Sequence, residues 1–401
     1  MVRRITRPFA LFFEEEASAG IFLLLATVAA LLWANSPAGA GYDHFWHYEL
    51  SWGSARPSLE LLVNDGLMAV FFFVVGLEIK RELLVGELAD RRRAALPVIA
   101  AAGGAIVPAL IYFAWNRSGA ARSGWGIPMA TDIAFAVGIL ALLGKRVPVG
   151  AKVFLTALAI ADDLIAVLVI ALFYTRRLSL PDLAAVALCA ALLFGLNALR
   201  IGSAWAYLAV GLALWFFTLR SGVHATIAGV LLAAAVPARG EEPLLPRLEA
   251  CLHPWVSFGV MPLFALANAG LHLRGDIVPA LRHSIVLGIW IGLVLGKPVG
   301  ITGAAWIATK LRWAALPTLV SWSDLHAVSW LGGIGFTMSL FIANLAFTHQ
   351  PALEMAKLGV FGGSLCAGLA GSALLVWASR HRREVEVAVT SEMESNEIQA
   401  K

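Results

Sequence analysis

The amino-acid sequence consists of long apolar runs separated by short polar connections. A helix that crosses the hydrocarbon core of a bilayer needs about 20 predominantly apolar residues, and these runs approach or reach that length. Because the connections are brief, the pattern predicts one compact bundle of about twelve transmembrane helices with no soluble domain. The expected segments are 18–34, 60–80, 95–116, 125–143, 150–174, 182–199, 205–219, 222–237, 249–271, 284–309, 326–347 and 357–379.

Composition and charge agree with this prediction. Hydrophobic residues make up 60% of the 401 positions and charged residues 14%, whereas soluble chains average about 45–50% and about 25%. The net charge of +4 does not indicate nucleic-acid binding, because the basic residues lie at the ends of apolar runs. The cysteines and histidines show no metal-ligand spacing, so we expect neither a cofactor nor a resident metal.

Two segments differ from the apolar runs. Residues 40–58 combine Trp46 and Trp52 with alternating polar positions, which suits an interfacial hairpin between the first two helices. Residues 384–401 are polar and acid-rich, which predicts a disordered tail after a single transmembrane domain over 1–383. Lys and Arg are about twice as frequent at one set of helix ends as at the other, which predicts that both termini are cytoplasmic.

Four charged residues lie inside apolar runs: Asp132, Asp162, Asp163 and Lys297. Each costs at least about 2.5–3.5 kcal/mol near the bilayer centre, so they should face a polar cavity or one another. Pairing between helices would explain one carboxylate and the lysine, but two carboxylates would then have no fixed partner. A mobile cation or protons can neutralise this excess of negative charge.

The adjacent pair Asp162 and Asp163 cannot have identical roles, because neighbouring residues on a helix point about 100° apart. One carboxylate can act as a cation ligand while the other reaches Lys297 on another helix. Protons and a hard cation then compete for the same carboxylate oxygens. Competition of this kind is the chemistry of an antiporter.

Two apolar runs contain residues that interrupt a helix. Segment 125–143 carries Pro128 and the polar pair Thr131-Asp132, and segment 326–347 carries the glycine-rich stretch 332–337. Glycines in membrane helices also serve simple close packing, and that reading stays open for the second stretch.

Two interrupted segments, each followed by one further helix, predict inverted repeats at about 95–174 and 284–379. Broken helices place the partial charges of helix ends near the membrane centre. Asp132 is a candidate to neutralise the N-terminal ends, and Lys297 the C-terminal ends.

These charged and broken segments lie within stretches that resemble the NhaA family of bacterial sodium/proton antiporters, over residues 11–380. The matching stretches are Asn64–Phe72, Gly76–Leu83, Pro128–Ala136, Asp162-Asp163, Leu219–Thr226, Leu252–Trp255, Gly296–Pro298 and Gly333–Ser339.

The resemblance implies an all-α polytopic membrane protein with inverted-topology repeats and two discontinuous helices that cross. It implies an electrogenic secondary transporter in a bacterial inner membrane, not an enzyme, which expels Na⁺ or Li⁺, imports a larger number of protons and serves sodium and pH homeostasis. Asp163 would be the principal ion ligand, with Asp162 beside it and salt-bridged to Lys297 in the closed state. Thr131 and Asp132 would line the site where the broken helices cross.

The resemblance further implies a homodimer through the 40–58 hairpin and a pH-sensing cluster at a cytoplasmic funnel. From the residues alone, the charges at 78–82 are equally an ordinary charged helix end, and the histidines equally packing residues. The members of the implied cluster are Glu78, Arg81, Glu82, Glu249, His253 and, on another helix, His224.

Two positions depart from the family pattern. Ile165 stands where glycine follows Asp-Asp-Leu in relatives, and the larger side chain can shift helix packing near the site. Pro246 replaces a basic residue that often stands three positions before the glutamate of the pH cluster, which bears on the pH set-point.

Three other functions compete with this interpretation. An intramembrane aspartyl protease also buries two aspartates, but its Gly-x-Gly-Asp and Tyr-Asp motifs are missing around Asp132, Asp162 and Asp163. A lysine beside the pair would also disturb the proton that such carboxylates share. A passive cation channel, or a transporter of potassium or an organic cation, fits the same buried charges.

Overall fold

The computed structural model describes residues 2–51, 56–175, 178–239, 243–272, 277–317 and 320–399, and only the backbone of 2–16, 145, 277 and 381–399. Within these ranges the chain is helical, and its one isolated antiparallel bridge joins Glu49 and Ser58. The longer helices are α1 (Val2–Ala34), α4 (Met68–Val85), α5 (Arg91–Trp115), α6 (Ile133–Leu143), α7 (Val149–Phe173), α8 (Leu180–Ala198), α9 (Ala204–Ser221), α10 (Thr226–Ala235), α11 (Leu244–Trp255), α15 (Lys297–Lys310), α16 (Trp322–Leu331), α17 (Phe336–Ala346) and α18 (Gln350–Gln399). The shorter elements are α2 (Gly39–Trp46), α3 (Leu59–Leu61), η1 (Leu62–Leu67), η2 (Glu87–Ala89), η3 (Ala120–Met129), η4 (Gly144–Arg146), η5 (Val256–Val260), α12 (Met261–Asn268), α13 (Ile277–Leu281), α14 (Ser284–Ile291) and η6 (Gly292–Gly296).

The membrane-spanning helices agree with the sequence pattern. Among the described residues, ten helices are long and apolar enough to cross a bilayer, and the bent pair α16–α17 makes an eleventh span. The shorter apolar helix α10 corresponds to the remaining predicted segment, 222–237. All twelve predicted segments are therefore helical, and the all-α polytopic architecture is confirmed.

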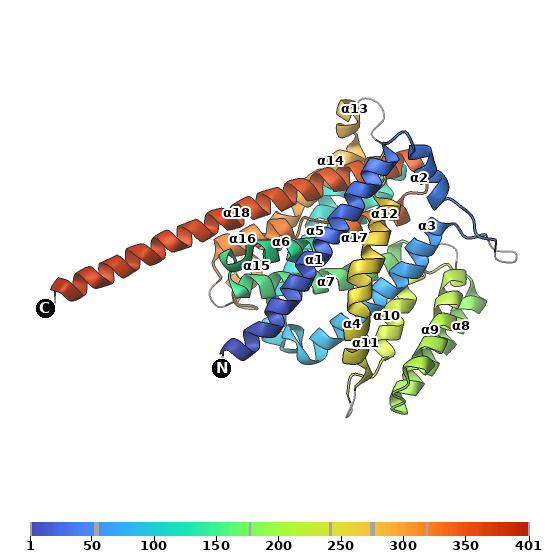
Figure 1. Ribbon diagram of the computed structural model, residues 1–401, viewed down its shortest axis with the longest axis horizontal. Helices are drawn as coiled ribbons and strands as arrows, with labels where there is room; N and C mark the ends of the chain where they lie inside the picture. Colours follow the sequence, from blue (N-terminus) through green and yellow to red (C-terminus); the bar gives the residue numbers. More distant parts are fainter. Residues whose placement is uncertain are drawn as a thin grey trace.

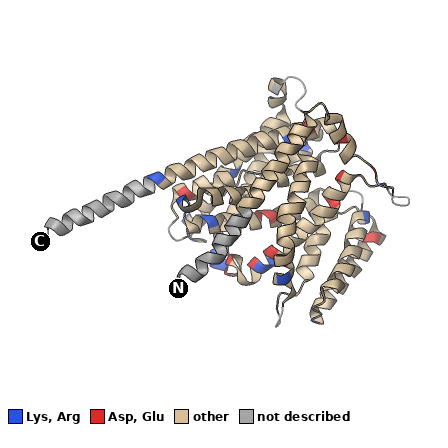
Figure 2. Ribbon diagram, in the orientation of Figure 1, with Lys and Arg blue, Asp and Glu red and all other residues tan. Residues whose placement is uncertain are grey.

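The helices form one bundle in which distant parts of the chain lie side by side (Figure 1). Helices α8 and α9 pack together at one edge, and α1 runs across the bundle against α6 and α12. Charged residues are sparse along the spans, as Figure 2 shows. Large apolar side chains such as Leu32, Leu172 and Leu369 are exposed on the bundle surface, as expected where the surroundings are lipid.

Both interrupted segments are broken helices, as predicted. The 3₁₀ helix η3 ends at Met129, and α6 begins only at Ile133. Helix α16 ends at Leu331, and α17 starts at Phe336 with its axis bent by 48°. Helix α17 packs against η3, so the two breaks lie at one place in the bundle.

The glycine-rich break also allows close packing, so the two readings of that stretch are compatible. A Cβ atom on Gly333 would collide with the carbonyl oxygen of Leu293. At another crossing, Gly103 of α5 and Gly300 of α15 bring the two helix backbones into contact. Small residues at such crossings are a common way to pack membrane helices closely. This crossing sets the position of Lys297, one helical turn before Gly300.

In the part of the chain that the structure describes, three single π-helical turns interrupt otherwise continuous helices, and the sequence pattern does not predict them. They are η1 between α3 and α4, η5 between α11 and α12, and η6 between α14 and α15. Turns of this kind are rare and occur frequently at functional sites. Here η1 contains Asn64 and Asp65, and η6 directly precedes Lys297.

The segment 40–58 differs in part from the expected hairpin. Its first part is helix α2, whose Tyr42 hydroxyl donates to the carbonyl oxygens of Leu266 and Ala267 at 2.8 and 2.9 Å. The pairing of Glu49 with Ser58 closes the second part, and residues 52–55, with Trp52, lie outside the described residues. Helix α18 runs to Gln399, through the stretch expected to be a tail.

Candidate functional site

The two adjacent aspartates and the lysine meet inside the bundle. The Lys297 ammonium donates to Asp162 Oδ2 at 2.6 Å and to Thr131 Oγ1 at 2.9 Å. Thr131 in turn donates to the carbonyl oxygen of Gly332 at the end of α16, at 2.8 Å. All three side chains are buried, with Lys297 and Thr131 at 0% exposure. The charges expected inside the membrane therefore come together, and the ion pair joins α7 to α15 beside both breaks.

Asp132 lies between the N-terminal ends of the two half-helices. Its Oδ1 accepts the Phe135 N–H at 3.1 Å as the N-cap of α6. Its Oδ2 accepts the Thr337 N–H at 2.9 Å, in the first turn of α17, and also the Thr337 hydroxyl. Helix N-termini carry partial positive charge and unpaired N–H groups, so a carboxylate here satisfies both. The hydrogen bond from Asp132 N–H to Ile334 O, at 2.6 Å, fixes the crossing further.

The lysine is less directly engaged with the C-terminal ends than the sequence pattern predicts. Its two hydrogen bonds go to Asp162 and Thr131, and the carbonyl of Gly332 is reached only through the threonine hydroxyl. The positive charge therefore lies near the end of α16 while pairing primarily with Asp162.

Replacing Asp132 with alanine should lower the free energy of unfolding by about 2 kcal/mol, because Phe135 N–H and Thr337 N–H both lose their acceptor. The measurement is the apparent melting temperature of the detergent-solubilised protein. Thr337→Ser is the matched control, because it keeps a hydroxyl donor at the same position. Equal melting temperatures for Asp132→Ala and wild type would contradict the capping role.

Asp163 differs from the other buried charges. It is 3% exposed, and its Oδ1 atom has no hydrogen-bond partner among the described residues. Asp162 Oδ1 also lacks a hydrogen-bond partner among the described residues, although Asp162 Oδ2 pairs with Lys297. Asp163 interacts electrostatically with Asp162, Glu78 and Asp132 and, with opposite sign, with Lys297. A buried carboxylate oxygen without a donor is costly unless a proton or a cation neutralises it.

A second group of charged residues, the α4–α11 cluster, consists of Glu78, Arg81, Glu82, Glu249 and His253. Arg81 Nη1 lies 2.5 Å from Glu249 Oε1, and Arg81 Nη2 lies 3.2 Å from Glu82 Oε1. The Nδ1 atom of His253 lies 3.0 Å from Glu78 Oε1. The structure therefore brings five of the six residues of the implied pH cluster together.

The sixth residue, His224, lies elsewhere. Its Nδ1 atom is 3.9 Å from Asp65 Oδ1, and its ring packs edge-on against Phe341 at 5.7 Å. Asp65 precedes Glu78 by thirteen residues on one continuous helical segment, which corresponds to about 20 Å at 1.5 Å per residue. His224 is therefore removed from the α4–α11 cluster by much of the thickness of the membrane.

Several polar residues of this region are not among the site residues that the sequence predicts. Thr337 is the partner of Asp132, and Asn268 hydrogen-bonds with Asn64 at 2.8 Å and with Asn344 at 2.5 Å. Thr337 and Asn64 lie in stretches that carry the family resemblance. The signal that could have found them is a neutral polar side chain within an apolar run, whereas a search for buried charge passes over them.

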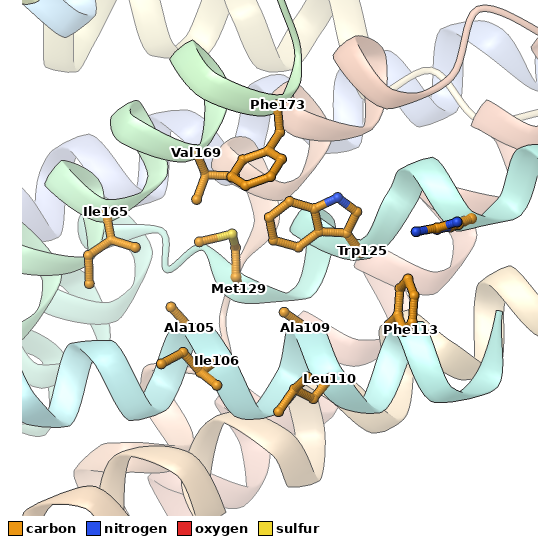
Figure 3. A pocket seen from close by; sticks show the side chains of 11 residues that line it. Ala105, Ile106, Ala109, Leu110, Phe113, Trp125, Met129, Ile165, Val169 and Phe173 are labelled. Carbon is orange, nitrogen blue, oxygen red and sulfur yellow. The ribbon is translucent and has the colours of Figure 1, made fainter. Parts of the chain in front are cut away.

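Both positions that depart from the family pattern lie among the described residues. Ile165 is half-buried and lines an apolar groove between α5, η3 and α7 (Figure 3). Pro246 is exposed in the first turn of α11, where proline is tolerated. Glu249 pairs with Arg81 without a basic residue at position 246.

Comparison with known proteins agrees with the architecture. The family model described as Na+/H+ antiporter 1 matches residues 10–375. The chain is 49% identical to the Na(+)/H(+) antiporter NhaA of Albidiferax ferrireducens, covering 95% of this chain and 99% of that protein. It is 47% identical to the Na(+)/H(+) antiporter NhaA of Koribacter versatilis, covering 92% and 91%. With a family match over most of its length and relatives of this similarity, the chain belongs to the Na⁺/H⁺ antiporter 1 family.

Proposed function

We propose that this protein expels Na⁺ or Li⁺ from the cell in exchange for H⁺. The observation that carries the proposal is the distribution of partners among Asp132, Asp162 and Asp163. Asp132 is satisfied by two helix ends. Asp162 pairs with Lys297 through Oδ2, and its Oδ1 has no partner among the described residues. Asp163 has a buried oxygen with no partner among the described residues, so its charge is available to an ion.

In this mechanism Asp163 is the principal ligand, and Asp162 and Thr131 contribute oxygens beside it. Carboxylate and hydroxyl oxygens are hard ligands, which suit Na⁺ and Li⁺. Binding of the cation draws Asp162 from Lys297, and protonation of the carboxylates releases the cation. Alternating access then exposes the two aspartates to one side of the membrane at a time. Lys297 and Asp132 compensate the charges of the broken helices throughout.

The exchange is proposed to be electrogenic, with more protons imported than sodium ions expelled, so that the membrane potential contributes to sodium extrusion. The relatives' names and the many apolar spans support a bacterial membrane protein, and we place it in the inner membrane with both termini cytoplasmic. The inverted repeats at 95–174 and 284–379 are supported by the order of elements, since each contains a broken helix between unbroken ones.

The α4–α11 cluster is proposed to regulate the exchange by pH. Arg81 pairs with Glu82 and Glu249, and His253 pairs with Glu78. Glu249 also interacts electrostatically with Glu78 and His253, so a change of protonation at one residue affects the others. Glu78 belongs to this cluster and also interacts electrostatically with Asp163, which links it to the ion site. A homodimer through 40–58 and a cytoplasmic tail over 384–401, after the last membrane span, complete the proposal.

Calorimetry of the purified protein tests the competition between ions. Sodium binding should release protons, and the number released should vary with pH as the carboxylates gain or lose protons beforehand. Titration in buffers of different ionisation enthalpy gives this number. Sodium binding without release of protons at any pH would end the proposal.

The rival functions differ in coupling and in selectivity. A passive cation channel would carry sodium current without coupled proton flux. A carrier for potassium or an organic cation would not respond to Na⁺ or Li⁺. Everted membrane vesicles with an imposed pH gradient separate these cases, because only the antiporter dissipates the gradient when Na⁺ or Li⁺ is added and K⁺ has no effect.

A further inference from the structure

An apolar groove of about 510 Å³ lies between α5, η3 and α7, and its lining does not include the buried charges of the ion site. Figure 3 shows Ala105 and Ala109 of α5 on one side, Val169 and Phe173 of α7 on the other, and Trp125 between them. The volume is within the range of about 300–1,000 Å³ that is typical of ligand sites. The lining residues are Ala105, Ile106, Ala109, Leu110, Phe113, Arg122, Trp125, Met129, Ile165, Val169 and Phe173.

The groove faces the surroundings of the bundle. Ile106, Leu110 and Phe173 are 57%, 61% and 63% exposed, so the walls are accessible from outside. Because α5 and α7 are membrane-spanning helices, these surroundings are lipid. Phe113 lies near the C-terminal end of α5, and Ala105 lies eight residues before it, about 12 Å along the helix. The groove therefore extends at least this far from the end of α5 toward the membrane interior.

One end of the groove is basic. Arg122 is exposed, and its guanidinium lies 5.0 Å from the centre of the Phe113 ring without an ion pair to a described carboxylate. The sequence has no Asp or Glu between Asp90 and Asp132, and none between Asp163 and Asp182. The guanidinium of Arg122 therefore lies at one end of the groove, and the chain segments that form the groove carry no Asp or Glu close to it in sequence. The ring centre of Trp125 lies 5.1 Å from that of Phe173. Tryptophan is enriched at membrane interfaces.

We propose that the groove binds an anionic phospholipid, with the phosphate on Arg122 and one acyl chain lying along α5 toward Ile165. A narrow apolar groove with a basic residue at its end matches a charged headgroup followed by a hydrocarbon chain. Basic pockets between transmembrane helices bind lipid headgroups for the same reason. The inner end of the groove is Met129 and Ile165, so the lipid chain contacts η3 just before its break and α7 two residues after Asp163.

Native mass spectrometry of the delipidated full-length protein tests the proposal. Dioleoyl phosphatidylglycerol should form the first adduct about fivefold more tightly than dioleoyl phosphatidylcholine, since one basic residue contributes about 1 kcal/mol at a membrane surface. Arg122→Gln should remove this preference, and Arg122→Lys should keep most of it. Ala109→Trp should weaken both lipids, because the indole fills the groove.

Arg117→Gln is the matched control, since Arg117 is exposed nearby but does not line the groove. Lipid binding is compared among variants whose melting temperatures equal that of the wild type, so that loss of folding is not mistaken for loss of binding. Equal binding of the two lipids by wild type would overturn the proposal, because the groove would then be an unselective contact with the bilayer. A preference for phosphatidylglycerol that survives in Arg122→Gln would overturn it as well.

Discussion

Replacing Asp163 with asparagine is expected to reduce sodium-driven proton exchange in proteoliposomes to the background of protein-free liposomes. The amide is close to the carboxylate in size, but it carries no negative charge and does not exchange a proton in the physiological range. The variant keeps the pair of Asp162 and Lys297 and loses the charge for which Na⁺ and H⁺ compete in the proposed mechanism. The measurement is the initial rate of pH change inside the liposomes after a sodium pulse.

Asp182→Asn is the control for this experiment, because it makes the same chemical change away from the ion site. Asp182 accepts from Ser179 Oγ at 2.7 Å and lies 3.4 Å from Arg220 Nε at the start of α8. Its pair with the exposed arginine contributes about 0–1 kcal/mol, so exchange should stay near the wild-type rate. Exchange by Asp163→Asn at the wild-type rate would exclude Asp163 as the principal ligand.

The sequence predicts the spans and the breaks because both depend on local composition. A bilayer requires long apolar runs, and a proline or a polar pair inside such a run interrupts it visibly. Charge inside the membrane is costly, so Asp132 and Lys297 are conspicuous within their apolar runs. The N-terminal role of Asp132 follows from the general charge of helix ends, and its hydrogen bonds to Phe135 and Thr337 agree with that role.

The features that the sequence does not predict depend on contacts between distant segments. The π-helical turns insert one extra residue where helices pack, and no residue type marks them. The family resemblance groups His224 with the α4–α11 cluster. Its neighbour in space is Asp65, which lies about 20 Å from Glu78 along the same helical segment. The alternating pattern of residues 40–58 suggests strands, whereas Tyr42 is docked in helical form against the end of α12.

The ion site combines two requirements that oppose each other. A buried Asp162–Lys297 pair holds α7 to α15, and the same pair must open if Asp162 is to contribute to a transported cation. Removing two ions from water is costly, and the attraction between them offsets that cost only while they stay together. A cation at Asp163 adds positive charge beside Lys297 and so weakens the pair. In the proposed mechanism, the opening of this pair couples ion binding to helix movement.

Replacing Lys297 with methionine should lower the free energy of unfolding by about 3–5 kcal/mol, because it leaves the Asp162 carboxylate buried without its partner. Lys297 is 0% exposed and Asp162 1%, so water cannot take over the role of the ammonium. The apparent melting temperatures of the variants in detergent rank their stabilities. Lys310→Met is the control on the same helix, since Lys310 is exposed above the Trp306 ring and should contribute about 1 kcal/mol or less.

The double variant Asp162→Asn, Lys297→Met separates the charge from the packing. It removes both ions, so it should melt above the single variant Lys297→Met even though it carries one more substitution. Such a reversal identifies the unpaired carboxylate as the source of the instability. If the double variant melted lower than the single one, the loss would come from packing around Lys297, and the ion pair would not be the element that links α7 to α15.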